Sequence, residues 1–254
     1  MTESLWWIKQ CELFRRLAPG ELQRLEQHSR CRSFPAKSPL ILPSDGAESV
    51  FLLTEGLAKL SHLTGDGRES ILAFIEPGEL FGELALFDDR KPEEYVETVE
   101  RCTVVAMPAE EVRRLVNEHA DLAVGVTRLV GLRRQRIERR LRNLLFRSNR
   151  ERLIHLLLDL SEQFGVQTND GVQLRVRLSH QDIASLIGST RESVTVLLGE
   201  LKSAGEIGGG RRRVVLTKPC QLAKSVGRKE VRLASGKPPD RNSALACLEP
   251  VTRP

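Results

Sequence analysis

An arginine and a glutamate stand side by side at the start of an expected helix, and their chemistry suits the recognition of bases. Arg191 and Glu192 follow a polar turn at 188–190, and apolar residues continue from Val194 at helical spacing. A guanidinium can donate two hydrogen bonds to guanine O6 and N7, and a carboxylate can accept one from cytosine N4. This pair at an exposed helix start therefore indicates a surface that reads base edges.

Two short helices within residues 178–201 are expected to present that pair. Ser179 and Asp182 form a capping box for the first helix; Ser189 with Glu192 offers the same device for the second, although Thr190 could equally be its cap. The expected inward residues are Ile183, Ala184, Ile187, Val194, Leu197, Leu198 and Leu201. The expected base-contacting residues are Arg191, Glu192, Thr195 and Val196. This layout is typical of a DNA-binding helix-turn-helix, the alternative being an ordinary helical hairpin with solvated charges.

A β-hairpin is predicted directly after these helices. Two short β-prone pieces within 204–216 flank a glycine-rich turn that carries Arg211, Arg212 and Arg213. Three consecutive cations on a hairpin tip can lie along a phosphate backbone. The combination indicates a winged helix-turn-helix, which is more specific than either half alone.

Composition limits the class of protein. The 254 residues carry a formal net charge of +5, a mildly basic balance that suits a nucleic-acid partner. The five cysteines are scattered, which favours a reduced, cytoplasmic protein over a disulfide framework or zinc site. No signal peptide and no apolar stretch approaching 18 residues is evident, so no membrane partner is expected.

The remaining sequence predicts an α+β protein. Residues 8–32 read as helical with an interruption near Pro19-Gly20, and from 31 to 107 short β-type pieces alternate with turns, as in a jelly roll. A short helix is expected at 109–118, a long one at about 120–147, another at 150–163 and a strand at 172–176. The expected domains are a sensor at 1–118, a dimerisation helix at 119–148, a winged helix-turn-helix at 149–218 and a disordered tail at 219–254.

The long helix carries an apolar stripe that favours a homodimer seam. Leu122 and Leu129 lie seven residues apart, as do Val130, Ile137 and Leu144. Its other faces carry seven arginines, Arg133 among them, that no monomeric core is expected to accept. The alternative is a helix packed on its own domain with a solvated basic face.

From about residue 11 to 218 the sequence resembles the CRP/FNR family of bacterial transcription regulators. The segments that carry the resemblance are 50–60, 77–87, 170–171 and 178–201, and the helix-turn-helix region looks most like the cyanobacterial nitrogen regulators of that family. The resemblance implies an N-terminal β-roll of the cyclic-nucleotide-binding type and a homodimer on a pseudo-palindromic double-stranded DNA site. It also implies contact with RNA polymerase if the protein is an activator.

The resemblance assigns roles by position. Arg191 and Glu192 match the base-reading pair, whereas Val196 replaces a second arginine, so the half-site should differ at that base. The residues implied in phosphate contact are Ser179, His180, Thr190 and Ser193, joined by Arg211, Arg212 and Arg213 of the wing. For His180, a plain surface role is nearly as plausible.

The effector is unknown. The family's phosphate-binding Arg-Ser pair falls on Glu93 and Glu94, and two carboxylates would repel a phosphate, so cAMP is not expected. The same position argues against 2-oxoglutarate. The candidate effector pocket comprises Phe81, Gly82, Glu83, Leu84, Glu94 and Ile137. Gly82 and Glu83 are alternatively the structural start of a short helix.

Other function classes fit less well. A metal-dependent jelly-roll enzyme needs clustered histidines, but the five here are isolated in sequence, so neither metal nor catalysis is expected. An iron–sulfur sensor needs more closely spaced cysteines than Cys11 and Cys31. A ligand-binding regulatory subunit that controls a partner protein is the main alternative, although such a subunit has no use for a winged helix.

Overall fold

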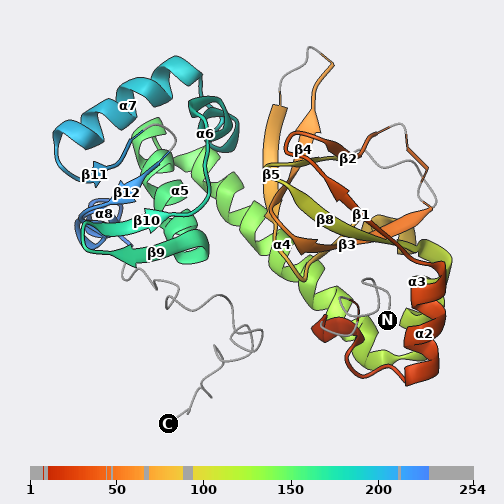
Figure 1. Ribbon diagram of the computed structural model, residues 1–254. Helices are drawn as coiled ribbons and strands as arrows, with labels where there is room; N and C mark the ends of the chain where they lie inside the picture. The colour runs from red at the N-terminus through yellow and green to blue at the C-terminus, as the bar shows by residue number, and fades with distance from the viewer. Residues whose placement is uncertain are drawn as a thin grey trace, which may run out of the picture. The chain divides into compact units, whose positions relative to one another are not determined.

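The chain folds into two compact units. The computed structural model describes residues 8, 11–43, 45–46, 48–65, 69–87, 94–210 and 213–228. One unit comprises Met1–Arg139 and the other Arg140–Pro254, with the boundary inside the long helix α4 (Ala120–Phe146; Figure 1). Among the described residues, no helix is both long and apolar enough to cross a membrane.

The first unit contains the expected β-roll, built from two four-stranded antiparallel sheets. One has the order β1-β8-β3-β6 and the other β2-β7-β4-β5. The strands are β1 (Arg30–Phe34), β2 (Pro39–Ile41), β3 (Ser49–Glu55), β4 (Ala58–Leu63), β5 (Glu69–Ile75), β6 (Leu80–Phe81), β7 (Tyr95–Thr98) and β8 (Cys102–Pro108). Inward side chains alternate along them, so that Leu53 and Val104 of one sheet and Leu60 and Val96 of the other share one core.

Helices cover the outer face of the first sheet. They are η1 (Glu12–Phe14), α2 (Pro19–His28), α3 (Ala109–Glu118) and the first turns of α4. Val105 and Met107 of β8 form a second core with Leu25 and Leu115 of these helices. Helix α2 starts at Pro19, where the interruption was predicted and where a missing N–H is tolerated, but the predicted helical stretch over 8–32 is wrong in extent, because α2 ends at His28 and β1 starts at Arg30. The prediction for 109–118 is confirmed.

The apolar stripe of α4 does not form a single face, which corrects its interpretation as one seam. Leu122 and Val126 are buried in the protein's own core, and Leu129 packs against them. Arg133 is also buried, so the expectation that no core of the single chain would accept it is wrong. A different set of apolar side chains on α4 is exposed: Val124, Val130, Leu132, Leu141, Leu145 and Phe146.

The second unit is a winged helix-turn-helix. Its helices are α5 (Asn149–Phe164), α6 (His180–Ile187), α7 (Arg191–Ser203) and α8 (Pro219–Ser225), and its strands are β9 (Gly165–Thr168), β10 (Gly171–Leu174), β11 (Ile207–Gly208) and β12 (Val215–Leu216). The sheet order is β11-β12-β10-β9. The strand predicted at 172–176 is observed as the shorter strand β10, which pairs with β9. Strand β9 itself was not predicted, because Val166 is its only large apolar residue.

The expectation of a disordered tail from residue 219 is wrong for its first ten residues. Helix α8 packs on α5, and Leu222 is completely buried. Beyond it, Arg228 forms ion pairs with Asp159 at 2.8 Å and Glu162 at 2.7 Å. The apolar pair Leu222 and Val226 has i, i+4 spacing, but the helix is too short to stand out among basic residues. The rest of the predicted tail, 229–254, lies outside the described residues.

Candidate nucleic-acid interface

Helix α7 begins at the predicted arginine. The N-cap is Thr190: its backbone is extended, and its side-chain oxygen accepts a hydrogen bond from the Ser193 amide at 3.2 Å. Of the two caps left open by the sequence, Thr190 is therefore the one used, and Arg191 is the first helical residue. The positive end of the helix macrodipole lies at the same place as the guanidinium.

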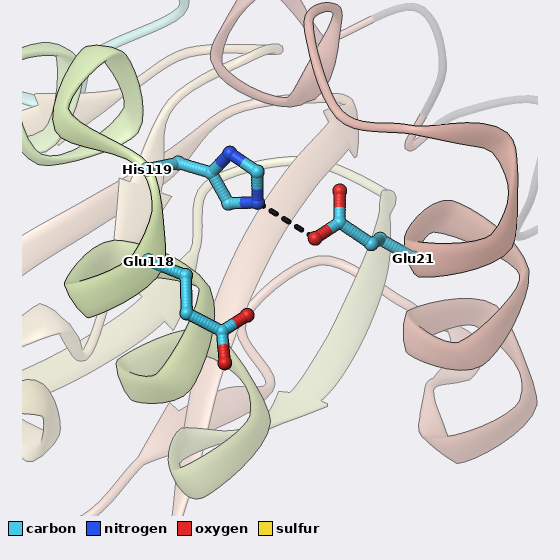
Figure 2. Close-up of side chains that lie close together, drawn as sticks. All are labelled: Glu21, Glu118 and His119. Atoms are coloured by element: carbon cyan, nitrogen blue, oxygen red, sulfur yellow. Dashed lines mark hydrogen bonds and ion pairs between the residues drawn. The ribbon is translucent and has the colours of Figure 1, made fainter.

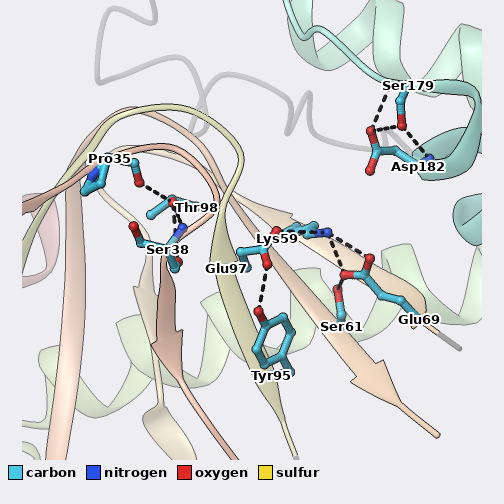
Figure 3. A network of polar contacts seen from close by, with 10 residues as sticks. All are labelled: Pro35, Ser38, Lys59, Ser61, Glu69, Tyr95, Glu97, Thr98, Ser179 and Asp182. Carbon is cyan, nitrogen blue, oxygen red and sulfur yellow. Dashed lines mark hydrogen bonds and ion pairs between the residues drawn. The ribbon is translucent and has the colours of Figure 1, made fainter. Parts of the chain in front are cut away.

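The preceding helix and turn hold α7 in place. Ser179 and Asp182 form the predicted capping box, with the Asp182 carboxylate accepting from both the Ser179 amide and hydroxyl (Figure 3). Gly188 ends α6 with φ +62°, and the Ser189 amide donates to the Ala184 carbonyl. A side chain at Gly188 would be strained by this backbone and would approach Leu144 to 2.9 Å.

The helix pair separates inward and outward residues as predicted. The predicted inward residues Ile183, Ala184, Ile187, Val194, Leu198 and Leu201 are buried, and Leu197 is half-buried. All four predicted base-contacting side chains are exposed; Val196 retains 60% of its surface.

One contact between the two helices was not predicted. The Nδ1 atom of His180 lies 2.7 Å from the Oγ1 atom of Thr195, and the same hydroxyl donates to the Arg191 carbonyl at 2.8 Å. The prediction assigned phosphate contact to His180 and base contact to Thr195. A contact across a turn between residues 15 apart leaves no periodic signal.

The predicted phosphate-contacting residues differ in their hydrogen bonds and in their exposure. Ser179 and Thr190 cap helices, and the Thr190 hydroxyl donates to Ser193 Oγ at 3.1 Å. Arg213 is exposed after the wing turn, whereas Arg211 and Arg212 lie outside the described residues. Their contact with phosphate stays a prediction.

Strands β11 and β12 pair antiparallel to form the wing. Gly209 at its turn has φ +104°, and a Cβ there would lie 2.3 Å from the Arg213 carbonyl oxygen. The turn of this hairpin therefore requires glycine at position 209.

The candidate effector residues surround a buried ion pair. Gly82 has φ +69° and precedes η2 (Glu83–Leu86), so the alternative of a structural helix start is consistent with its conformation. The Glu83 carboxylate, only 6% exposed, accepts two hydrogen bonds from Arg133 of α4, at 2.9 and 3.0 Å. Arg133 also donates to the Leu80 carbonyl. The role of Arg133 as the partner of Glu83 was not predicted, because the two residues lie 50 positions apart in the sequence.

The other members of the predicted pocket differ in exposure. Phe81 is buried and stacks on Phe51 with ring centroids 5.1 Å apart. Leu84 is 49% exposed and Ile137 is half-buried. Glu94 is half-buried, and its pKa is raised by burial and then by the nearby Glu83 carboxylate, against the opposing effect of Arg133. Glu93 lies outside the described residues.

Other groups of polar side chains have their partners within the protein. Glu21, Glu118 and His119 lie together, but His119 contacts Glu21 at 2.7 Å and Glu118 pairs with Arg114 (Figure 2). In the β-roll the buried Lys59 ammonium lies 2.7 Å from Glu69 and 3.3 Å from Glu97 (Figure 3). These contacts satisfy structural charges rather than form an open site.

Comparison with known proteins gives the same division of the chain. A model of the cyclic nucleotide-binding domain matches residues 31–119, and a model of the Crp-like helix-turn-helix domain matches residues 151–225. The global nitrogen regulator of Nostoc is 31% identical over 84% of this chain and 94% of its own. A CRP-like cAMP-activated global transcriptional regulator of Mycobacterium tuberculosis is 24% identical over 84% of this chain and 95% of its own.

A solved structure shows the same fold. The c-di-GMP responsive global regulator CLP of Xanthomonas campestris superposes with a TM-score of 0.70 at 25% identity, covering 78% of this chain and 99% of that one.

Proposed function

Because the chain belongs to the CRP/FNR family of transcriptional regulators, we propose that two copies bind one pseudo-palindromic DNA site with α7 of each copy in the major groove. The observation that supports this proposal most strongly is the exposed start of α7. Arg191 and Glu192 are exposed on its first turn, while Val194 and Leu198 fix the opposite face in the core.

Base recognition follows from the chemistry of that first turn. Arg191 would donate to guanine, and Glu192 would accept from cytosine N4. Residues that contact the phosphates set the register without reading sequence. Ser193, His180 and the wing cation Arg213 are proposed for that role with Ser179, Thr190, Arg211 and Arg212; His180 and Arg213 are exposed, and Ser193 is half-buried.

The dimer seam would use the exposed apolar residues of α4. Val130 and Leu141 are 37% and 52% exposed, and the half-buried Ile137 and Leu144 continue the heptad spacing of Val130. Apolar side chains at this spacing on a long helix bury their surface against a second copy of the helix. A dimer places two recognition helices about 34 Å apart, one turn of DNA.

The proposal excludes a cyclic phosphate as the effector. Arg133, the buried cation beside the predicted pocket, is already neutralised by Glu83, and Glu94 adds a second carboxylate nearby. Because that ion pair carries no net charge, a phosphate would meet the uncompensated carboxylate of Glu94 there. If the protein is an activator, the bound dimer would also contact RNA polymerase.

The experiment is selection of duplexes from a random library by the purified protein, repeated with two arginine variants. Arg191→Ala should lose the preference for one guanine in each half-site, and each lost bidentate contact corresponds to about 1–3 kcal/mol of discrimination. Arg213→Ala should weaken binding to all sequences similarly and reduce its salt dependence. The assignment is wrong if both variants lose affinity equally for every sequence.

A further inference from the structure

The hydrogen bonds of Thr195 restrict what this residue can offer to a base. A threonine hydroxyl has one hydrogen to donate. In this structure that hydrogen is used within the helix, because Thr195 Oγ1 lies 2.8 Å from the Arg191 carbonyl oxygen, which can only accept. Thr195 therefore has no donor left for guanine O6, guanine N7 or thymine O4.

His180 completes this arrangement. Its Nδ1 atom lies 2.7 Å from the same hydroxyl oxygen. Since the hydroxyl hydrogen points to the Arg191 carbonyl, the imidazole must be the donor in this contact. One lone pair of Thr195 is thus occupied, and the hydroxyl is held by two partners on the protein side.

The second turn of the recognition surface consequently offers no hydrogen-bond donor from these side chains and presents mainly methyl groups. Thr195 follows Arg191 by four residues and Val196 follows Glu192 by four, so each lies on the same face as its charged partner, about 6 Å further along the helix. Val196 is 60% exposed and has no polar atom in its side chain. The first turn of α7 thus presents the two charged side chains, and the second turn presents methyl groups.

We propose that this second turn reads thymine through its 5-methyl group, with Thr195 and Val196 supplying the apolar contact and His180 acting as a positioning residue. Apolar side chains recognise the thymine methyl in the major groove, where no other natural base presents one. The inference rests on the proposed function, since it requires α7 to lie in that groove. It predicts thymine near the guanine that Arg191 reads.

The test uses the duplex that the full-length protein selects from a random library. Each thymine of a half-site is replaced in turn by deoxyuridine, which lacks only the methyl group, and binding is followed by fluorescence anisotropy at constant salt. At one or two positions near the guanine, we expect affinity to fall about fourfold for each methyl group removed. Thymines elsewhere in the duplex serve as internal controls.

Protein variants assign the contact. Val196→Ala should reduce the loss caused by deoxyuridine at one position, and Thr195→Ser, which keeps the hydroxyl, should do so at the other. Glu200→Ala, an exposed change further along α7, should leave the deoxyuridine losses as in the unmodified protein.

His180 is tested by base preference rather than by affinity. His180→Ala should broaden the selection at the position facing Thr195 while the guanine preference due to Arg191 persists. His180→Asn, whose side-chain amide can donate from nearly the same place as Nδ1, should restore the thymine preference.

The outcomes separate this inference from the proposed function. If guanine is selected through Arg191 but every thymine tolerates deoxyuridine, the methyl readout is refuted and the DNA-binding role stands. If no sequence is selected at all, or Arg191→Ala leaves the guanine preference unchanged, the proposed function itself fails.

Discussion

Removing one member of the buried ion pair between Glu83 and Arg133 should destabilise the fold strongly, whereas removing both charges together should not. Their side chains are 8% and 9% exposed and share two hydrogen bonds of 2.9 and 3.0 Å. Arg133→Met would leave the carboxylate buried without its partner, at a cost of about 3–5 kcal/mol. For a unit of this size, that loss lowers its Tm by about 10 °C.

The double variant Glu83→Met with Arg133→Met removes both charges and should stay within about 1 kcal/mol of the unmodified protein. Free energies of unfolding are measured by urea titration followed by circular dichroism. The matched control is Arg134→Met on the same helix, because Arg134 is 77% exposed and water screens its ion pair with Glu138. A single variant as stable as the control, or a double variant as unstable as the two single losses added, would refute the reasoning.

Three further predictions concern stability. Glu94→Gln should raise the Tm at pH 8, and the gain should shrink as the pH falls below the raised pKa of Glu94 and vanish below the ordinary carboxyl pKa, where the group is neutral in both the folded and the unfolded state; a gain that is constant with pH contradicts this. Thr190→Ala should cost about 0.5–2 kcal/mol by removing the N-cap of α7, measured by urea unfolding, with Glu200→Ala as an exposed control on the same helix; equal midpoints for both would contradict the capping role. Gly56→Ala should destabilise the β-roll by more than about 1 kcal/mol, because its φ is +86° and the added Cβ would lie 2.2 Å from the Arg101 carbonyl oxygen; thermal unfolding unchanged from that of Gly65→Ala, where nothing lies within 4 Å, would show that the backbone adapts.

Local signals in the sequence predicted the DNA-binding unit well. A capping box spans three residues and a turn glycine acts on its own backbone, so Ser179, Asp182 and Gly188 could be interpreted without knowledge of the fold. The outward position of Val196 followed from helical periodicity. The choice between Ser189 and Thr190 as the N-cap could not be made, because both offer a hydroxyl at suitable spacing.

Contacts between distant residues could not be predicted in the same way. Arg133 resembled the surface arginines around it, and only the folded chain brings Glu83 to it from 50 residues away. The contact between His180 and Thr195 crosses a turn between two helices. Periodicity also could not divide the apolar residues of α4 into buried and exposed ones. Leu122 and Val130 each have an apolar residue seven positions later, although Leu122 is buried and Val130 is exposed.

The central claim is that two copies of α7 read two half-sites on one face of the duplex. It is tested most directly by footprinting on the selected DNA site and on the same site with five base pairs inserted between its halves. The insertion turns one half-site to the opposite face of the helix, so binding should fall to the level of unrelated DNA, while a ten-base-pair insertion should affect it less. Unchanged affinity and protection of a single half-site on the five-base-pair variant would mean that one copy is sufficient, contrary to the dimeric recognition proposed here.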